Sequence, residues 1–169
     1  MPNPRILDKR RNSIRNIRKI TRTMELIATA RFKKAMARAS SVAAYADRIM
    51  QLVMDLTHAE LEVRYPLLEA RPETKHARLL VLTANRGLCG GFNGNLERAG
   101  MQHWQEFQQA LPRCRLEISG KHGIGAFKFR GIDADQTFTH FEDKPTFGEV
   151  EVLANRYLDE YATGALDRL

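Results

Sequence analysis

The segment LLVLTANRGLCGGFNGNL, residues 79–96, decides the fold of this chain. Its opening run, Leu79–Leu82, is apolar and predicts a buried strand, and residues 95–110 after it place apolar side chains at helical spacing. Between the two stand four glycines: Gly87, Gly90, Gly91 and Gly94. Because a glycine-rich turn from strand to helix often holds a phosphate, the segment is either a nucleotide-binding loop or a turn that needs glycine for its geometry.

The two common phosphate motifs do not fit this chain. A P-loop needs GxxxxGK[ST], but the glycine segment holds no lysine, and Gly120-Lys121 is followed by His122. The dinucleotide fingerprint GxGxxG begins at Gly123 but meets lysine at position 128. We therefore interpret the four glycines as a tight structural turn packed against a neighbouring element, and we expect no cofactor and no nucleotide site.

The histidines and cysteines predict no catalytic or metal site either. The five histidines lack metal-ligand spacing. Cys89 stands in the glycine turn and could be a nucleophile, but packing of a small residue is the more frequent role. The two cysteines form no CxxC pair, which favours a reducing compartment.

Strands and helices alternate after residue 77, which predicts an α/β fold with a small, Rossmann-like parallel sheet. The expected strands are 77–84, 115–119 and 135–141, and the expected helices are 95–110, 124–129 and one that begins after Thr146. Thr146 and Glu149 form a capping-box pattern, and Gly164 is the expected stop of that last helix.

The N-terminal part of the chain predicts one very long helix. From Arg5 to Tyr65 there is no glycine or proline; Pro66 follows directly and Pro72 soon after. Apolar residues recur there in steps of three and four, as in a coiled-coil seam: Phe32, Ala35, Ala39, Val42, Ala46, Ile49, Val53 and Leu56. We therefore expect a shaft helix over 1–65, a linker over 66–76 and an α/β domain over 77–169. The seam lacks a second long helix in this chain to pack against.

The charge of the chain is concentrated on this predicted helix. The net charge is +7, yet the residues up to Arg38 carry +10 and the remainder carries −3. An electrostatic partner should therefore bind the helix. No uncharged apolar run approaches the roughly 18 residues that span a bilayer, and the N-terminus lacks the features of a secretory signal.

Several stretches resemble, in order along the chain, the γ subunit of F-type ATP synthase. ITRTMELIATARFKKAMARA (20–39) resembles the N-terminal helix of that family, and residues 79–96 resemble its most recognisable segment. GKHGIGAFKFRG (120–131) and the helix from Phe147 fit its middle portion. The family continues into further strands and a C-terminal helix after the point that corresponds to Leu169, so we expect this chain to be a part of such a subunit.

The resemblance implies a non-catalytic rotor, with the glycine segment as scaffold and contact surface. In this family an N-terminal and a C-terminal helix form a coiled coil inside a ring of α and β subunits, and its rotation couples ion flow to ATP synthesis or hydrolysis at the β subunits. The globular part lies at the foot with the ε subunit and the membrane c-ring, on the cytoplasmic face of the bacterial inner membrane or an equivalent energy-transducing membrane. The residues that would contact the ring are Ile20, Met24, Arg31, Lys33, Lys34 and Arg38.

Two alternatives from other classes stay open at this point. A basic coiled-coil helix can bind nucleic acid or an anionic surface, although the basic residues lack a clean two-faced pattern and have no aromatic platform beside them. A nucleotide-using α/β enzyme is the other alternative, and saturable nucleotide binding would identify it.

Overall fold

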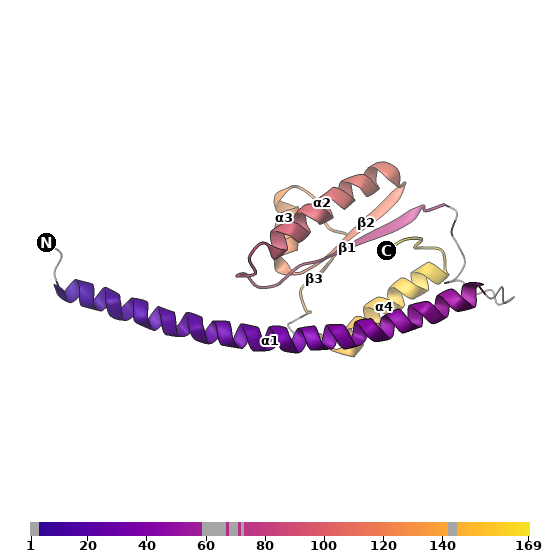
Figure 1. The fold of residues 1–169 in the computed structure, drawn as a ribbon. Coiled ribbons are helices and arrows are strands. Elements are labelled where there is room, and N and C mark those ends of the chain that lie inside the picture. The colour runs from indigo at the N-terminus through magenta and orange to yellow at the C-terminus, as the bar shows by residue number, and fades with distance from the viewer. Residues whose placement is uncertain (1–3, 59–66, 68–70, 72, 142–144) are drawn as a thin grey trace. The chain divides into compact units, whose positions relative to one another are not determined.

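The computed structural model describes residues 4–58, 67, 71, 73–141 and 145–169 (Figure 1). The chain divides into two compact units, Met1–Glu62 and Val63–Leu169.

The first unit is built on a single uninterrupted helix, α1 (Pro4–His58), of 55 residues. Proline suits the first turn of a helix because the missing N–H would find no partner there. Five hydroxyl side chains along α1 donate to backbone carbonyls three or four residues earlier: Ser13, Thr21, Thr23, Thr29 and Ser41. The predicted long helix is confirmed, and its expected parts at 1–3 and 59–65 lie outside the described residues. None of the helices in the described ranges combines the length and apolar character required to cross a membrane.

The second unit contains a parallel sheet of three strands in the order β1-β2-β3. The strands are β1 (His76–Leu82), β2 (Arg113–Ser119) and β3 (Gln136–Phe138). Val81 pairs with Ile118 in the first ladder, and Ile118 pairs with Thr137 in the second. The parallel α/β fold predicted from the sequence is confirmed.

Three helices accompany the sheet: α2 (Phe92–Ala110), α3 (Lys121–Phe129) and α4 (Phe147–Ala162). Two of them begin earlier than expected, α2 at position 92 instead of 95 and α3 at 121 instead of 124. Strand β3 is shorter than the expected 135–141, because its ladder ends at the pair Ser119–Phe138, where β2 ends and the chain turns into α3. Beyond it, the Phe141 carbonyl accepts from the Asn85 amide at 2.8 Å. The expected capping box of α4 is confirmed, and Gly164 follows its end with a left-handed φ of +78°.

Alternation along β2 shows how the helices cover the sheet. Leu116 and Ile118 face a core that also contains Val81, Trp104 of α2 and Phe127 of α3. Glu117 points to the opposite face and bonds Arg156 and Tyr157 of α4. Because successive side chains of a strand point to opposite faces, α2 and α3 cover one face of the sheet and α4 covers the other.

Candidate functional site

The carboxyl ends of the strands form the edge where open α/β sheets usually bind ligands. Thr83, Ala84 and Asn85 follow β1 there, and Gly120 joins β2 to α3. Gly120 has a φ of +99°, and a Cβ at this position would lie 2.1 Å from the Thr83 carbonyl oxygen. Glycine is therefore required at this junction, where β1 and the start of α3 meet without room for a side chain.

The backbone donors at the start of α3 are already bonded to the protein itself. The Lys121 N–H donates to Asn85 Oδ1 at 3.0 Å, and the His122 N–H donates to the Ala84 carbonyl at 3.4 Å. The Gly123 N–H donates to Thr83 Oγ1 at 2.9 Å. A phosphate at a helix start binds to such N–H groups, so the turn after β1 occupies the position that a phosphate would need.

Gly87, Gly90 and Gly91 form an exposed turn before α2, whereas Gly94, also expected in the turn, lies in the first turn of α2. Gly90 has a φ of +56°, and Leu88 shares the left-handed region at +66° while being 95% exposed. A Cβ on Gly87 or Gly91 would meet other atoms only at ordinary contact distance, 3.8 Å, and one on Gly90 or Gly94 would meet nothing within 4 Å. The close approaches lie instead at Gly100, Gly120 and Gly123, which the sequence analysis did not single out.

Helix α1 carries the residues for which ring contact and a coiled-coil seam were expected. The six expected contact residues are all exposed: Ile20, Met24, Arg31, Lys33, Lys34 and Arg38. The seam residues are exposed as well, apart from the half-buried Val53, and Phe32 and Val42 are each 64% exposed. Large apolar side chains repeated along one helix are a surface for another helix.

Metal ligands and thiols are the remaining candidates for a chemical site within the residues that the structure describes. No three His, Cys, Asp or Glu side chains gather there into a possible metal site. Cys89 is exposed, and burial raises the pKa of the Cys114 thiol, which makes it a poorer nucleophile.

A buried ionic network on the α4 face of the sheet was missed by the sequence analysis. Glu117 accepts from Arg78 Nη1 at 2.7 Å, from Arg156 Nη2 at 2.6 Å and from the Tyr157 hydroxyl at 2.6 Å. Arg78 also pairs with Glu160 at 2.6 Å. Burial together with the bond to Glu117 raises the pKa of Tyr157 to about 12. The signal in the sequence was a charge at a position facing the sheet interior in each strand, Arg78 in β1 and Glu117 between the apolar Leu116 and Ile118 of β2, since buried charges are normally paired.

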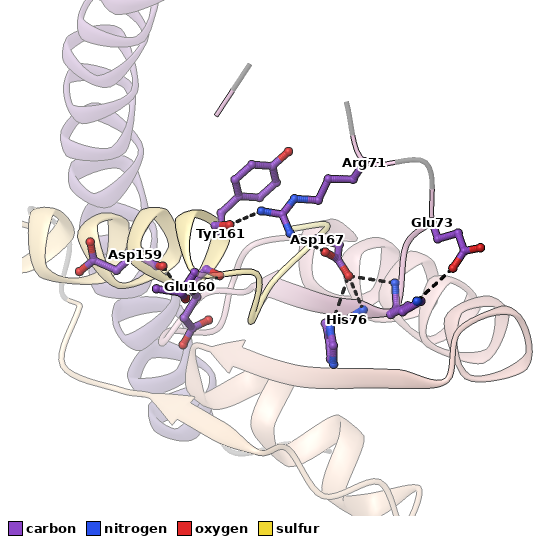
Figure 2. A network of polar contacts seen from close by, with 9 residues as sticks. Arg71, Glu73, His76, Asp159, Glu160, Tyr161 and Asp167 are labelled. Carbon is purple, nitrogen blue, oxygen red and sulfur yellow. Dashed lines mark hydrogen bonds and ion pairs between the residues drawn. The ribbon is translucent and has the colours of Figure 1, made fainter. Parts of the chain in front are cut away.

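A second polar cluster surrounds Asp167, next to the first residues of β1 (Figure 2). The Asp167 carboxylate accepts from the backbone N–H groups of Lys75 and His76, at 2.9 and 2.8 Å, and from Arg71 Nη1 at 2.9 Å. The His76 and Lys75 N–H groups, with Arg71 behind them, lower the pKa of Asp167 to about 2. The carboxylate thereby joins three groups that lie far from it in the sequence, and residue Arg168 beside it forms a parallel bridge with Ala77 of β1.

We expect Asp167 to make the α/β unit sensitive to strong acid. Its pKa is lower in the folded chain than the value of about 4 in an unfolded one, so protonation favours unfolding. The stability that the carboxylate contributes is present above about pH 4 and is lost as the pH falls towards 2. Urea unfolding followed by Trp104 fluorescence between pH 5 and 2 should show a smaller acid dependence for Asp167→Asn than for the wild type. The same dependence in both chains would contradict this assignment.

The comparisons with known proteins agree on one family. A family model described as ATP synthase matches residues 3–169. The ATP synthase gamma chain of Rhodopirellula baltica is 52% identical over 169 residues, which are 100% of this chain and 57% of the relative. That of Leptospira biflexa is 35% identical over 167 residues, 99% of this chain and 58% of the relative. The chain therefore spans less than two thirds of the length of these relatives.

A solved structure of a rotor also matches at low similarity. The rotor of the Euglena gracilis mitochondrial ATP synthase gives a TM-score of 0.38 at 16% identity, over 75% of this chain and 48% of that one.

Proposed function

Because this chain belongs to the ATP synthase γ-chain family, we propose that it supplies the shaft helix and much of the foot of a central-stalk subunit. In this proposal the subunit is non-catalytic. It rotates inside the ring of α and β subunits and couples ion flow through the membrane sector to ATP synthesis or hydrolysis at the β subunits. It is peripheral to the membrane, on the cytoplasmic face of a bacterial inner membrane or an equivalent energy-transducing membrane.

The observation that carries the proposal is the exposed apolar seam along an uninterrupted helix of 55 residues. A helix with Phe32 and Val42 each 64% exposed needs a partner helix to remove these side chains from water. The partner that we propose is the C-terminal helix of the complete subunit, as the resemblance to the family implies.

The same proposal assigns roles to the parts of the chain. Residues 1–65 are the shaft, 66–76 the linker and 77–169 most of the foot, which meets the ε subunit and the membrane c-ring. The ring contacts are the six exposed residues Ile20, Met24, Arg31, Lys33, Lys34 and Arg38. The bonded N–H groups at the start of α3 support a scaffold role for the α/β unit rather than nucleotide chemistry.

The seam provides the test of the proposed function. We expect the isolated chain to self-associate or fray along α1, and the C-terminal helix of the family, added in trans or by extension, to give a fully helical, monodisperse species. Circular dichroism and sedimentation should also show that Val42→Glu abolishes this effect. Ala44→Glu is the matched control, because it introduces the same charge two positions away, on the opposite side of α1.

An assembly assay then distinguishes a rotor subunit from a basic coiled-coil protein that binds nucleic acid or an anionic surface. The extended chain should assemble with isolated α and β subunits into an ATPase, and the Val42→Glu variant should not. A monodisperse, fully helical chain without a partner would contradict the proposal that the apolar seam of α1 packs against a second helix. Salt-dependent binding to random DNA without assembly would favour the alternative of a basic coiled-coil protein for nucleic acid or an anionic surface.

A further inference from the structure

Strand β2 has an open edge along its first half. Strand β3 pairs with β2 only over residues 117–119, so the segment Arg113–Arg115 has β1 on one side and, among the described residues, no strand on the other. The Arg113 N–H donates to the Lys75 carbonyl, on the β1 side, at 3.2 Å. Because a strand in a parallel ladder bonds its two neighbours through alternate residues, the N–H and C=O of Cys114 face the open edge.

The next residue that faces this edge shows how such a backbone pair is satisfied. The Leu116 N–H donates to the Asp135 carboxylate at 2.8 Å, and the Leu116 carbonyl accepts from the Asp135 N–H at 2.8 Å. No residue that the structure describes makes the same two bonds with the Cys114 backbone. Unpaired groups on the edge of a sheet are a template for another extended segment. Cys114 therefore offers one donor and one acceptor to such a segment.

A groove of about 400 Å³ lies along the same edge, between the end of α2 and the start of β2. Its lining residues are Gln108, Leu111, Pro112, Arg113, Cys114 and Arg115. Leu111 and Cys114 are half-buried and make one side of the groove apolar. Successive side chains of an extended segment point to opposite faces, so a segment added here would place one side chain beside Leu111 and its two neighbours beside the arginines.

The α4 side of this edge carries two guanidinium groups that have no partner among the described residues. Arg113 and Arg115 are both exposed. The carboxylate on the same side of β2, that of Glu117, is already bonded to Arg78 and Arg156. Because arginine binds a carboxylate through two parallel N–H groups, this excess of positive charge favours a segment with acidic side chains.

We propose that the open edge of β2 binds an extended acidic segment of a partner protein, which adds to the sheet beside Cys114. Backbone bonds to Cys114 fix its register, one apolar side chain enters the groove at Leu111, and the acidic residues on either side of it bind Arg113 and Arg115. The alternation of acidic and apolar residues distinguishes this partner from a nucleic acid, which offers charge without a strand. The surface lies wholly within the α/β unit, so its test does not depend on the rotor function.

The probe is a fluorescein-labelled peptide of alternating valine and glutamate, titrated with the whole chain and followed by fluorescence anisotropy. We expect Arg113→Ala and Arg115→Ala to weaken binding roughly threefold each and roughly tenfold together, because each removes one charge-assisted contact. A peptide with glutamine in place of glutamate, and one with N-methyl groups on its backbone nitrogens, should each bind at least tenfold more weakly. Hydrogen exchange at the Cys114 amide should slow at least fivefold when the glutamate peptide binds.

The matched control changes Arg98 and Lys128 to alanine together, since these exposed residues lie elsewhere on the α/β unit and removing them makes the same change in net charge. This double variant should bind the peptide as the wild type does. All the substitutions lie outside α1, so self-association of that helix is the same in every chain compared.

Four results would overturn the proposal. If the wild type does not bind the glutamate peptide, the arginines only keep the edge from pairing with other chains, as charges on edge strands do. Equal binding of the N-methylated peptide, or unchanged exchange at Cys114, would show that no strand is added. An equal loss from the control variant would reduce the effect to general attraction. Displacement of the peptide by a short oligonucleotide more readily than by unlabelled peptide would assign the patch to nucleic acid.

Discussion

Replacing Glu117 by alanine is expected to lower the free energy of unfolding of the α/β unit by about 3–5 kcal/mol, the usual cost of removing one partner from a buried ionic pair. The carboxylate is 2% exposed and accepts from Arg78, Arg156 and the Tyr157 hydroxyl. Without it, a buried guanidinium keeps only part of its pairing, and a buried hydroxyl loses its acceptor. Since domains are commonly stable by only about 5–15 kcal/mol, this variant should be close to unfolding.

The measurement is urea unfolding followed by the fluorescence of Trp104. This residue is the only tryptophan of the chain and lies in the core of the α/β unit, so its signal reports on that unit and not on α1. Glu117→Gln keeps the size of the side chain and should be intermediate. Glu106→Ala is the control, because Glu106 is exposed and bonds Gln102 and His103 of its own helix, contacts that contribute little to stability. A similar loss from Glu106→Ala and Glu117→Ala would show that the network is not a major source of stability.

The same network marks the limit of what could be predicted from the sequence. The apolar run from Leu79 to Leu82 and the helical spacing that includes Trp104 are local patterns, and they predicted the strand, the helix and the parallel sheet. The T-x-x-E capping box is local as well, and the bonds between Thr146 and Glu149 confirm it. Local patterns suffice where one element decides its own structure.

The polar contacts could not be predicted because they join residues far apart in the chain. Glu117 meets Arg156 39 positions later, and Arg71 meets Asp167 96 positions later. The sequence shows only that Glu117 stands between two apolar residues, Leu116 and Ile118, and many partners could satisfy its charge. Which arginine does so depends on the packing of α4 against the sheet, and this is decided by the whole fold.

The glycines illustrate the same limit at closer range. Four glycines in one segment suggested close packing there, yet the tight approaches occur at single glycines such as Gly100 and Gly120. Gly100 stands where α2 lies against β1, since a Cβ would come within 3.1 Å of a Val81 methyl group. A single glycine inside a helix gives no local sign of this contact. The dense glycine segment instead allows an exposed turn with left-handed residues at Leu88 and Gly90.

The second large expected effect concerns the basic part of α1 and its binding to the ring. Arg31, Lys33, Lys34 and Arg38 are all exposed, and their positions along the helix distribute the charge over more than one face. A shaft that turns inside a ring cannot depend on one fixed ion pair, because each such pair would have to break at every step. Diffuse charge, acting over a Debye length of about 8 Å, attracts with little dependence on angle.

Single substitutions and the complete reversal should therefore differ sharply. Each exposed pair is worth only about 0–1 kcal/mol, so the change of any one of the four residues to alanine should leave the assembled ATPase nearly intact. Reversal of all four to glutamate should weaken binding to the isolated ring roughly tenfold or more. Several favourable ion-pair contributions are lost together, and repulsion between like charges replaces them. The salt dependence of binding should fall at the same time.

The experiment measures binding of the chain, extended by the C-terminal helix, to the isolated ring of α and β subunits across a salt series. The control reverses four exposed basic residues of the α/β unit, Arg98, Arg113, Lys121 and Lys128, and so makes the same change in net charge. If the basic side chains of α1 attract the inner surface of the ring, only the reversal on α1 weakens binding and reduces its salt dependence. Equal affinities and equal salt slopes for the wild type and the α1 variant would mean that these four side chains are a solvated face of the helix, and that the apolar contacts of residues such as Ile20 and Met24 hold the shaft in place.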